Sequence, residues 1–475
     1  MASDTARTRM PSADAAWLHM DRATNLMVIN SLLLFDEQVY WPRVREIVRT
    51  RLVDRYPRFR QRVAESGGPR GGVFWEDDPH FDLDLHLHHL ALPAPGNRAA
   101  LQELVADLMA EPLDRAKALW HVYMVDGYGE GCAMYVRMHH CIADGIALAR
   151  VMLSLTDSEP DAGIAAAQQV DEGGGLRSLV HTGWSAAEAL AHEGMEAIAH
   201  PREELGRVAG AAQTDARALA HVFLAGDDAE TALKGDLGVA RRVAWSEPLP
   251  LGHVKDVAHQ NEATVNDVLV AAMTGALREY LERRDSLVDQ IRAFVPFNLR
   301  PLDRPLPAAL GNKFGLVSLP LPVGARTAAE RLRKVKQHMD AIKGSPEGVI
   351  SYGVLEAMGH TPLKVESAIL DLFSAKGTAV ITNVPGPRET VYLAGTPVSA
   401  VAVWAPTSGS VSMSVSIFSY DGRVTVGVMA DAGLVPDPET MVDGFQSELD
   451  ALARIRPRRH PPRKRPASRS ARPDA

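Results

Sequence analysis

Cysteine, long apolar runs and metal-binding motifs are scarce in this sequence of 475 residues. The only two cysteines, Cys132 and Cys141, provide no disulfide framework and favour a reducing compartment. There is no uninterrupted apolar run of about 20 residues, and residues 1–10 lack the apolar core of a signal peptide. No cysteine pair and no His-Glu-x-x-His helix supplies metal ligands. These absences predict a cytoplasmic chain that does not span a membrane and holds no metal.

Charge is distributed unevenly along the chain. The formal net charge is -8, yet residues 456–475 hold eight Lys or Arg against one Asp, a local charge of +7, which leaves -15 on the rest. This basic, proline-rich tail predicts disorder. Attraction to anionic lipid headgroups, worth about 1 kcal/mol per basic residue, fits such a tail, and a solvated tail without a partner is the alternative. Because the body is acidic, we do not expect nucleic acid as a partner.

The length and the changes in composition predict two domains with a connector between them. Residues 1–160 and 236–455 mix helical and strand-like patterns, which indicates an α/β protein. Residues 161–235 are rich in Ala, Gly, Glu and Asp and are expected to form a helical connector. In the connector, residues 176–184 carry an apolar stripe at helical spacing that would pack on the body or contact a membrane surface. The expected helices are 41–56, 98–109, 176–199, 203–225 and 265–281, and the expected strands include 27–35, 134–139, 241–245, 378–382 and 424–429.

The most informative stretch is His-His-Cys-Ile-Ala-Asp-Gly at residues 139–145. An imidazole can take a proton from a hydroxyl near neutral pH, since its unperturbed pKa is about 6.5. Side chains alternate faces along the preceding strand, so His140 shares a face with apolar residues and His139 points the other way. Asp144 can lock a tight turn or pair with a cation. This pattern favours His140 as a general base and His139 as a residue behind it.

Two other readings of this heptapeptide stay open at the level of the residues alone. Adjacent histidines and an aspartate also occur in ordinary loops, where the imidazoles are solvated or satisfied in the core. A metal site is the second alternative, although adjacent strand residues point apart and cannot easily chelate one ion.

The heptapeptide matches the His-His-x-x-x-Asp-Gly signature of the acyl-CoA-dependent acyltransferases related to chloramphenicol acetyltransferase, condensation domains and plant acyltransferases. From about residue 10 to residue 450 the chain resembles the bacterial wax ester synthase/diacylglycerol acyltransferase family in particular. Ala118 stands where that family usually has proline in Pro-Leu-Trp. The other motifs are Pro-Ser-Ala-Asp-Ala-Ala-Trp-Leu at 11–18, Tyr-Pro-Arg-Phe-Arg at 56–60, Trp75, Phe-Asp-Leu at 81–83, His86, Pro-Leu-Asp-Arg at 112–115, Thr-Val-Asn-Asp at 264–267, Val-Pro-Phe-Asn-Leu-Arg at 295–300, Gly-Asn at 311–312, Asn-Val-Pro-Gly-Pro at 383–387 and Ser-Tyr-Asp-Gly at 419–422.

The resemblance implies a fold and an activity. Two α/β domains like chloramphenicol acetyltransferase would pack around a central substrate tunnel. The enzyme would be an O-acyltransferase that moves a fatty acyl group from acyl-CoA, as co-substrate, to diacylglycerol or a long-chain alcohol. It would need no cofactor and form no covalent acyl-enzyme. Its place would be peripheral, at the inner membrane or at lipid droplets.

The resemblance also implies roles for further residues. Thr264 and Asp267 make a near match to a helix capping box, which puts Asn266 in the first helical turn, where N–H groups favour developing negative charge. The family resemblance marks Asn266 as catalytic together with His140, His139 and Asp144, and implies a salt bridge between Asp144 and an arginine. Substrate contacts are assigned to Gly145, Asp267 and Asn383.

Two rival functions are a condensation-type enzyme that uses another acyl carrier and a non-catalytic lipid-binding relative. The intact signature and the later family motifs argue against both. Ser410, Ser412, Ser414 and Ser416 alternate with apolar residues, which predicts a strand with one polar face, solvated by default or lining a channel. Asp-Gly at 421–422 predicts a hairpin turn.

Overall fold

The structure is a computed structural model that describes residues 7–66, 72–164, 226–300, 306–343, 347–359, 361 and 363–455. The predicted connector helices at 176–199 and 203–225, the stripe at 176–184 and the basic tail at 456–475 lie outside the described residues.

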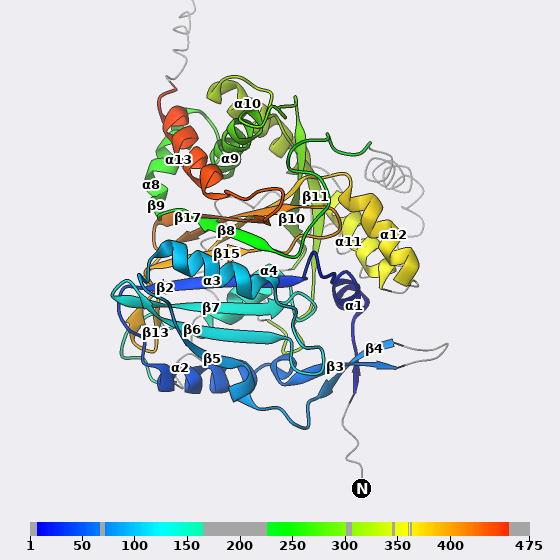
Figure 1. Cartoon of the computed structure of the whole chain (residues 1–475), viewed down its shortest axis with the longest axis vertical. Coiled ribbons are helices and arrows are strands. Elements are labelled where there is room, and N and C mark those ends of the chain that lie inside the picture. The colour runs from blue at the N-terminus through cyan, green and yellow to red at the C-terminus, as the bar shows by residue number, and fades with distance from the viewer. Residues whose placement is uncertain are drawn as a thin grey trace, which may run out of the picture.

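Two mixed β-sheets organise the molecule, one in each half (Figure 1). The smaller has the strand order β15-β2-β7-β6-β5, and the larger has the order β11-β10-β12-β16-β17-β8, with β9 on β17. The strands of the smaller sheet are β15 (Ala400–Trp404), β2 (Val28–Phe35), β7 (Gly131–His139), β6 (Trp120–Tyr128) and β5 (Leu87–Ala91). Those of the larger are β11 (Phe314–Leu321), β10 (Ile291–Asn298), β12 (Ala379–Pro385), β16 (Met413–Tyr420), β17 (Arg423–Asp431), β8 (Arg241–Trp245) and β9 (Leu249–Pro250). Small sheets are formed by β1 (Thr8–Arg9), β4 (Gly72–Asp77) and β3 (Gln61–Ser66), and by β13 (Tyr392–Leu393) and β14 (Thr396–Pro397).

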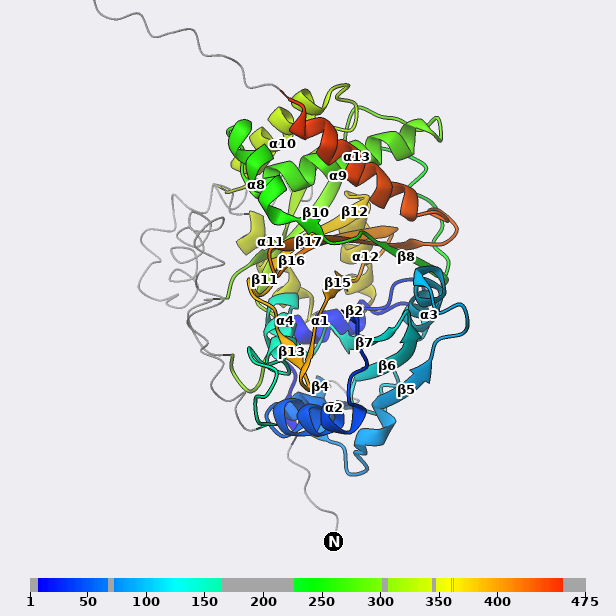
Figure 2. The same ribbon diagram turned by 90° about the vertical axis from the view of Figure 1, so that its left-hand side faces the viewer.

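Helices pack against the faces of these sheets. Those that gather over the larger sheet (Figure 2) are α8 (Leu251–Gln260), α9 (Val265–Glu282), α10 (Ala328–Lys343) and α13 (Glu439–Ala453). The others are α1 (Ser12–His19), α2 (Trp41–Ile47), α3 (Arg98–Ala110), α4 (Gly145–Leu153), α11 (Glu347–Met358) and α12 (Leu363–Ser374). Within the described ranges, none of the helices combines the length and the apolar character needed to cross a membrane.

The central strand β7 is buried along its whole length, because both faces of the smaller sheet are covered. Met134 and Met138 point into a core shared with α1, α2 and α4, whereas Ala133 and Tyr135 point into a core shared with α3. The period-2 pattern that predicted this strand therefore separates two cores. It also decides which way the residues after the strand will point.

The predicted helix in the second half forms as α9. Thr264 is its N-cap, and Thr264 and Asp267 bond reciprocally as a capping box, with Thr264 N donating to Asp267 Oδ2 at 2.8 Å. Its apolar face packs into the core of the larger sheet with α10 and α13. The boundary of this helix was thus readable from its cap.

Two expectations need correction. The helix predicted for 41–56 is regular only to Ile47 and continues as a π-helical segment, η1 (Val48–Val53). It stops before Pro57, because a proline disfavours helical backbone in the residue before it. The serine face is solvated only at Ser410, which is exposed and precedes β16, because Ser412, Ser414 and Ser416 are all at most 3% exposed.

Ser412 and Ser416 are buried under two other parts of the chain, of which β15 is one. Ser416 Oγ donates a hydrogen bond to the carbonyl of Val403 in β15, and Ser412 Oγ donates to the carbonyl of Leu233. The predicted hairpin after β16 is confirmed, with Asp421 and Gly422 at φ values of 46° and 68°. Both values suit the mirror-image turn that joins twisted strands.

Strand β15 ties the two halves together. It belongs to the second half of the sequence, yet it pairs antiparallel with β2 and completes the sheet of the first half. Its last residue, Trp404, is fully buried and contacts Trp245 of β8 edge to face, with ring centroids 5.9 Å apart. The second half of the chain therefore contributes one strand to the sheet of the first half.

Candidate active site

The loop between β7 and α4 is fixed at both of its ends. At the start, His139 N donates to Leu119 O at 2.9 Å and His140 N donates to Met27 O at 2.7 Å. At the end, Asp144 is the N-cap of α4, and its Oδ1 accepts a hydrogen bond from Ala147 N at 2.8 Å. The heptapeptide is therefore a rigid strand-to-helix junction.

His140 points into a cavity between the two sheets and is only 5% exposed. Its ring stacks on Trp17 of α1, with centroids 4.2 Å apart and planes 19° apart, and lies 5.3 Å from the ring of Phe314. Burial lowers the pKa of His140 from 6.5 to about 4, against the opposing influence of the Asp144 charge. The imidazole is therefore neutral at physiological pH.

His139 faces away from this cavity, as the alternation of β7 predicted. Its Nδ1 accepts a hydrogen bond from Cys141 N at 3.1 Å, and its Nε2 lies 3.7 Å from Asp21 Oδ2. Burial alone would raise the pKa of Asp21, but the nearby ring of His139 and the hydrogen bond from Met27 N help to hold it below its usual value. His139 is thus placed behind the loop, where it meets a carboxylate and not the cavity.

Asp144 joins the loop to the second half of the chain. Its Oδ2 accepts hydrogen bonds from Arg300 Nη2 and from Lys313 N, both at 3.0 Å. Arg300 also donates to Gly311 O at 2.7 Å. The structure thereby identifies the arginine of the expected salt bridge as Arg300, the last residue of the motif at 295–300.

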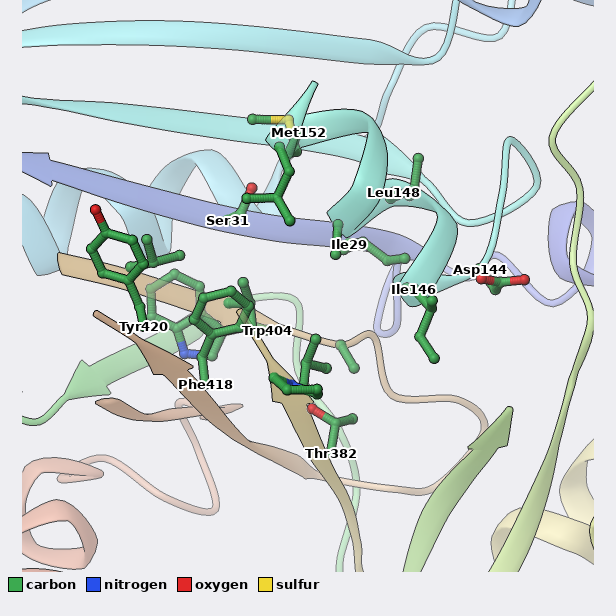
Figure 3. Close-up of a pocket in the computed structure, with 18 of the residues that line it drawn as sticks. Ile29, Ser31, Asp144, Ile146, Leu148, Met152, Thr382, Trp404, Phe418 and Tyr420 are labelled. Carbon is green, nitrogen blue, oxygen red and sulfur yellow. The ribbon is translucent and has the colours of Figure 1, made fainter. Parts of the chain in front are cut away.

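The cavity beside His140 encloses about 200 Å³ and is mostly apolar. Ile146, Leu148 and Met152 of α4 and Ile29 and Ser31 of β2 lie on one side of it (Figure 3). The opposite side comes from the second half of the chain and includes Thr382, Trp404, Phe418 and Tyr420. A space of this composition suits hydrocarbon chains better than polar substrates.

Two of the assigned amides meet at the edge of this cavity. Asn383, near the end of β12, lines the cavity and donates its Nδ2 hydrogen bond to Asn266 Oδ1 at the start of α9. Asn266 is half-buried and is not among the residues that line the cavity. Because the oxygen of Asn266 is the acceptor, its amide N–H groups remain donors, and they have no partner among the described residues.

The two other assigned substrate contacts differ in position. Gly145 borders the cavity, and a Cβ added to it would meet no atom within 4 Å, so no close packing requires glycine there. Asp267 is fully buried and uses Oδ2 to cap α9. Its Oδ1 has no hydrogen-bond partner within the described chain, and the residue does not line the cavity.

Cys141 follows the base but does not share its cavity. Its thiol is fully buried, and burial raises its pKa well above 9, so the thiol stays protonated. Across the described ranges, no group of three or more His, Cys, Asp or Glu side chains is arranged to hold a metal ion.

Four residues shape the site without having been given an individual role from the sequence. Trp17 and Phe314 surround the ring of His140, Arg300 pairs with Asp144, and Asn312 Nδ2 donates to His140 O at 2.8 Å. Trp17, Arg300 and Asn312 lie in motifs shared with the resembled family. The resemblance therefore pointed to these three residues, but their contacts could be identified only from the structure.

Residues 10–269 match the family described as the wax ester synthase/diacylglycerol acyltransferase catalytic domain, and residues 310–453 match the WS/DGAT C-terminal domain. A Mycobacterium tuberculosis protein named as a probable diacylglycerol O-acyltransferase is 29% identical over 423 residues, which cover 86% of this chain and 87% of that protein.

Solved structures show the same architecture. The wax ester synthase/diacylglycerol acyltransferase from Marinobacter aquaeolei VT8 superposes with a TM-score of 0.66 at 22% identity, covering 94% of this chain and 98% of that one. The first condensation domain of the calcium-dependent antibiotic synthetase gives a TM-score of 0.59 at 16% identity, covering 94% and 96%. The predicted two-domain α/β fold of this superfamily is confirmed.

Proposed function

Because this chain belongs to the wax ester synthase/diacylglycerol acyltransferase family and is an acyltransferase, we propose that it moves a fatty acyl group from acyl-CoA to the hydroxyl of diacylglycerol, with long-chain alcohols as further acceptors. The observation that carries the proposal is the neutral ring of His140 at the wall of an apolar cavity between the two halves. The relative named as a diacylglycerol O-acyltransferase favours diacylglycerol as the acceptor.

His140 would act as the general base. With a pKa of about 4 it is a weak base, so proton removal from the hydroxyl would accompany the attack of the oxygen on the thioester carbonyl. The imidazolium formed in this step would be a strong acid in its buried surroundings. It would return the proton to the sulfur of CoA when the carbon–sulfur bond breaks.

An amide at the cavity edge would stabilise the oxyanion of the tetrahedral intermediate. Asn266 is the candidate donor, since its oxygen is occupied by Asn383 and its N–H groups remain. Its position in the first turn of α9 adds the positive end of the helix dipole. A weak base makes this contribution more important, because negative charge must be stabilised before the thiolate leaves.

No covalent acyl-enzyme is needed in this scheme. The nearest cysteine, Cys141, is protonated, buried and outside the cavity that His140 lines. A direct transfer between two substrates bound together is therefore the simpler route.

Thiol release with purified protein, palmitoyl-CoA and either dioleoylglycerol or hexadecanol tests the proposal. We expect acceptor-dependent release with diacylglycerol and triacylglycerol as the product. No release with either acceptor would favour a non-catalytic lipid-binding protein. Transfer only from a carrier-protein thioester would favour a condensation-type enzyme.

We also propose that the protein associates peripherally with a lipid surface through its basic tail, residues 456–475. The charge of this segment and the lipophilic substrates support the proposal, since basic residues are attracted to anionic headgroups. Binding to anionic vesicles should weaken when the tail is deleted and when salt shortens the electrostatic reach to about 8 Å. Vesicle binding that is indifferent to both changes would assign adhesion to apolar surface.

A further inference from the structure

Two family-like motifs, at 11–18 and 311–312, have no part in the function proposed above, although they meet next to the base. Asp14 of α1 is fully buried, and its Oδ1 accepts hydrogen bonds from both N and Nδ2 of Asn312, each at 2.9 Å. The same Asn312 Nδ2 donates to His140 O at 2.8 Å. A continuous path of hydrogen bonds thus leads from Asp14 to the backbone of His140.

We propose that Asp14 is a positioning residue for the acyl transfer, because its carboxylate fixes Asn312 and Asn312 holds the backbone carbonyl of His140 in place. This inference rests on the proposed role of His140 as the base. Asp14 touches neither substrate nor base directly and would act only through Asn312.

The surrounding backbone makes Asn312 a suitable intermediary. Gly311 N donates to Ile142 O at 3.1 Å, and Gly311 O accepts from Arg300 Nη2 at 2.7 Å. Gly311 has a φ of 91°, a conformation that favours glycine, and an added Cβ would lie 3.4 Å from Asp14 Oδ2. The segment therefore passes close over the catalytic loop, and Asp14 meets it from the other side.

Helix α1 also contacts the side chain of His140 directly. Trp17 lies three residues after Asp14, and its ring stacks on that of His140. One helix therefore restrains the backbone of His140 through Asn312 and the ring of His140 through Trp17. Such double support suits a base that must hold its geometry, since a displacement of about 1 Å can cost about 100-fold in rate.

The carboxylate is retained at an energetic cost. Burial raises the pKa of Asp14 to about 6, although the hydrogen bonds from Asn312 oppose the rise. Its Oδ2 has no hydrogen-bond partner in the described part of the chain. The positioning role depends on the acceptor that Oδ1 offers to Asn312, which an amide oxygen can also provide.

The test compares Asp14→Ala, Asp14→Asn, Asn312→Ala and the double variant Asp14→Ala/Asn312→Ala in the full-length enzyme. Asp14→Ala and Asn312→Ala should each lower kcat by about 10- to 100-fold and leave the KM for palmitoyl-CoA within about twofold. The double variant should lose no more than the worse single variant, because both act through one path. Asp14→Asn should keep kcat within about threefold, since an amide oxygen can still accept from Asn312.

Asp228→Ala is the matched control, because Asp228 is 6% exposed and accepts hydrogen bonds from Arg292 N and Thr378 Oγ1, and none of these residues lines the cavity beside His140. It should lower the melting temperature and leave kcat unchanged below the transition. Losses that multiply in the double variant, or an Asp14→Ala enzyme with the parent's kcat, would overturn the inference. So would an Asp14→Asn enzyme that melts like the parent but is as slow as Asp14→Ala.

The His140→Ala variant distinguishes a failure of the positioning role of Asp14 from a failure of the proposed function. A dead His140→Ala enzyme beside an unimpaired Asp14→Ala enzyme refutes the positioning role alone. An active His140→Ala enzyme refutes the proposed function itself.

Discussion

Asp144 Oδ2 and Arg300 Nη2 lie 3.0 Å apart, and their side chains are only 4% and 6% exposed. The two residues are 156 positions apart and come from different halves of the chain. Asp144 also caps α4 with its other oxygen, so one carboxylate connects the loop of residues 139–145, the helix after it and the opposite half.

Breaking this pair should cost stability as well as rate. Asp144→Asn leaves the Arg300 charge buried without its partner, which costs about 3–5 kcal/mol of unfolding free energy. Urea denaturation followed by tryptophan fluorescence measures the loss. Glu279→Gln is the control, since its ion pair with Arg283 is exposed and should contribute at most about 1 kcal/mol. An Asp144→Asn enzyme that unfolds like the parent but is inactive would indicate a direct catalytic role instead.

Replacing the two histidines should have unequal effects. His140→Ala should remove nearly all turnover while acyl-CoA binding persists, because only proton transfer is lost, a contribution of about 10²–10⁴-fold. His139→Ala should cost less, since its ring contacts Asp21 and Cys141 and not the cavity. Steady-state thiol release and acyl-CoA titration give the two quantities. A greater loss in His139→Ala would reverse the assignment of the base.

The pH dependence of kcat/KM should show the burial of His140. Because burial disfavours the imidazolium and lowers the pKa to about 4, the free enzyme keeps its base neutral as the pH falls through 6.5. Activity should decline only as the pH approaches 4, after correction for unfolded protein. Since the unfolded chain takes up this proton near pH 6.5, the contribution of His140 to stability is present above 6.5 and lost between 6.5 and 4. An acid limb centred near 6.5 would mean that His140 is not the titrating base.

Removing the proposed oxyanion donor should affect kcat. Asn266→Ala should lower kcat by about 10²- to 10³-fold with little change in KM, because the interaction forms only in the transition state. Asn261→Ala provides the control, since that amide bonds to Val257 O at the end of α8. If Asn266→Ala is harmless and Asn383→Ala is not, the donor is Asn383.

Local patterns predicted the elements around the site. Alternation along β7 placed His140 and His139 on opposite faces, and the cap at Thr264 located the start of α9. Each of these inferences uses a period or a cap that lies within one element. That is why the directions of the two histidine side chains and the start of α9 could be predicted before the fold was known.

Long-range contacts could not be predicted in this way. The bonds of Arg300 to Asp144 and of Asn312 to His140 span 156 and 172 residues. The prediction that the serine face is solvated was wrong for the same reason. A row of small polar residues has the same sequence pattern whether water or β15 covers it. Burial there depends on a strand that arrives from the opposite half.

The late position of β15 in the sequence also determines when the smaller sheet can be completed during biosynthesis. Ser399, next to β15, bonds to Leu34 of β2 across a separation of 365 residues. At about 5–20 residues per second, the ribosome needs about 20–70 s to make that stretch, and β2 has an open edge throughout. An unpaired edge strand invites aggregation, so the nascent chain should depend on chaperones until residue 404 emerges. The cavity beside His140, which is lined by Trp404, Phe418 and Tyr420, can form only after residue 420 has been translated.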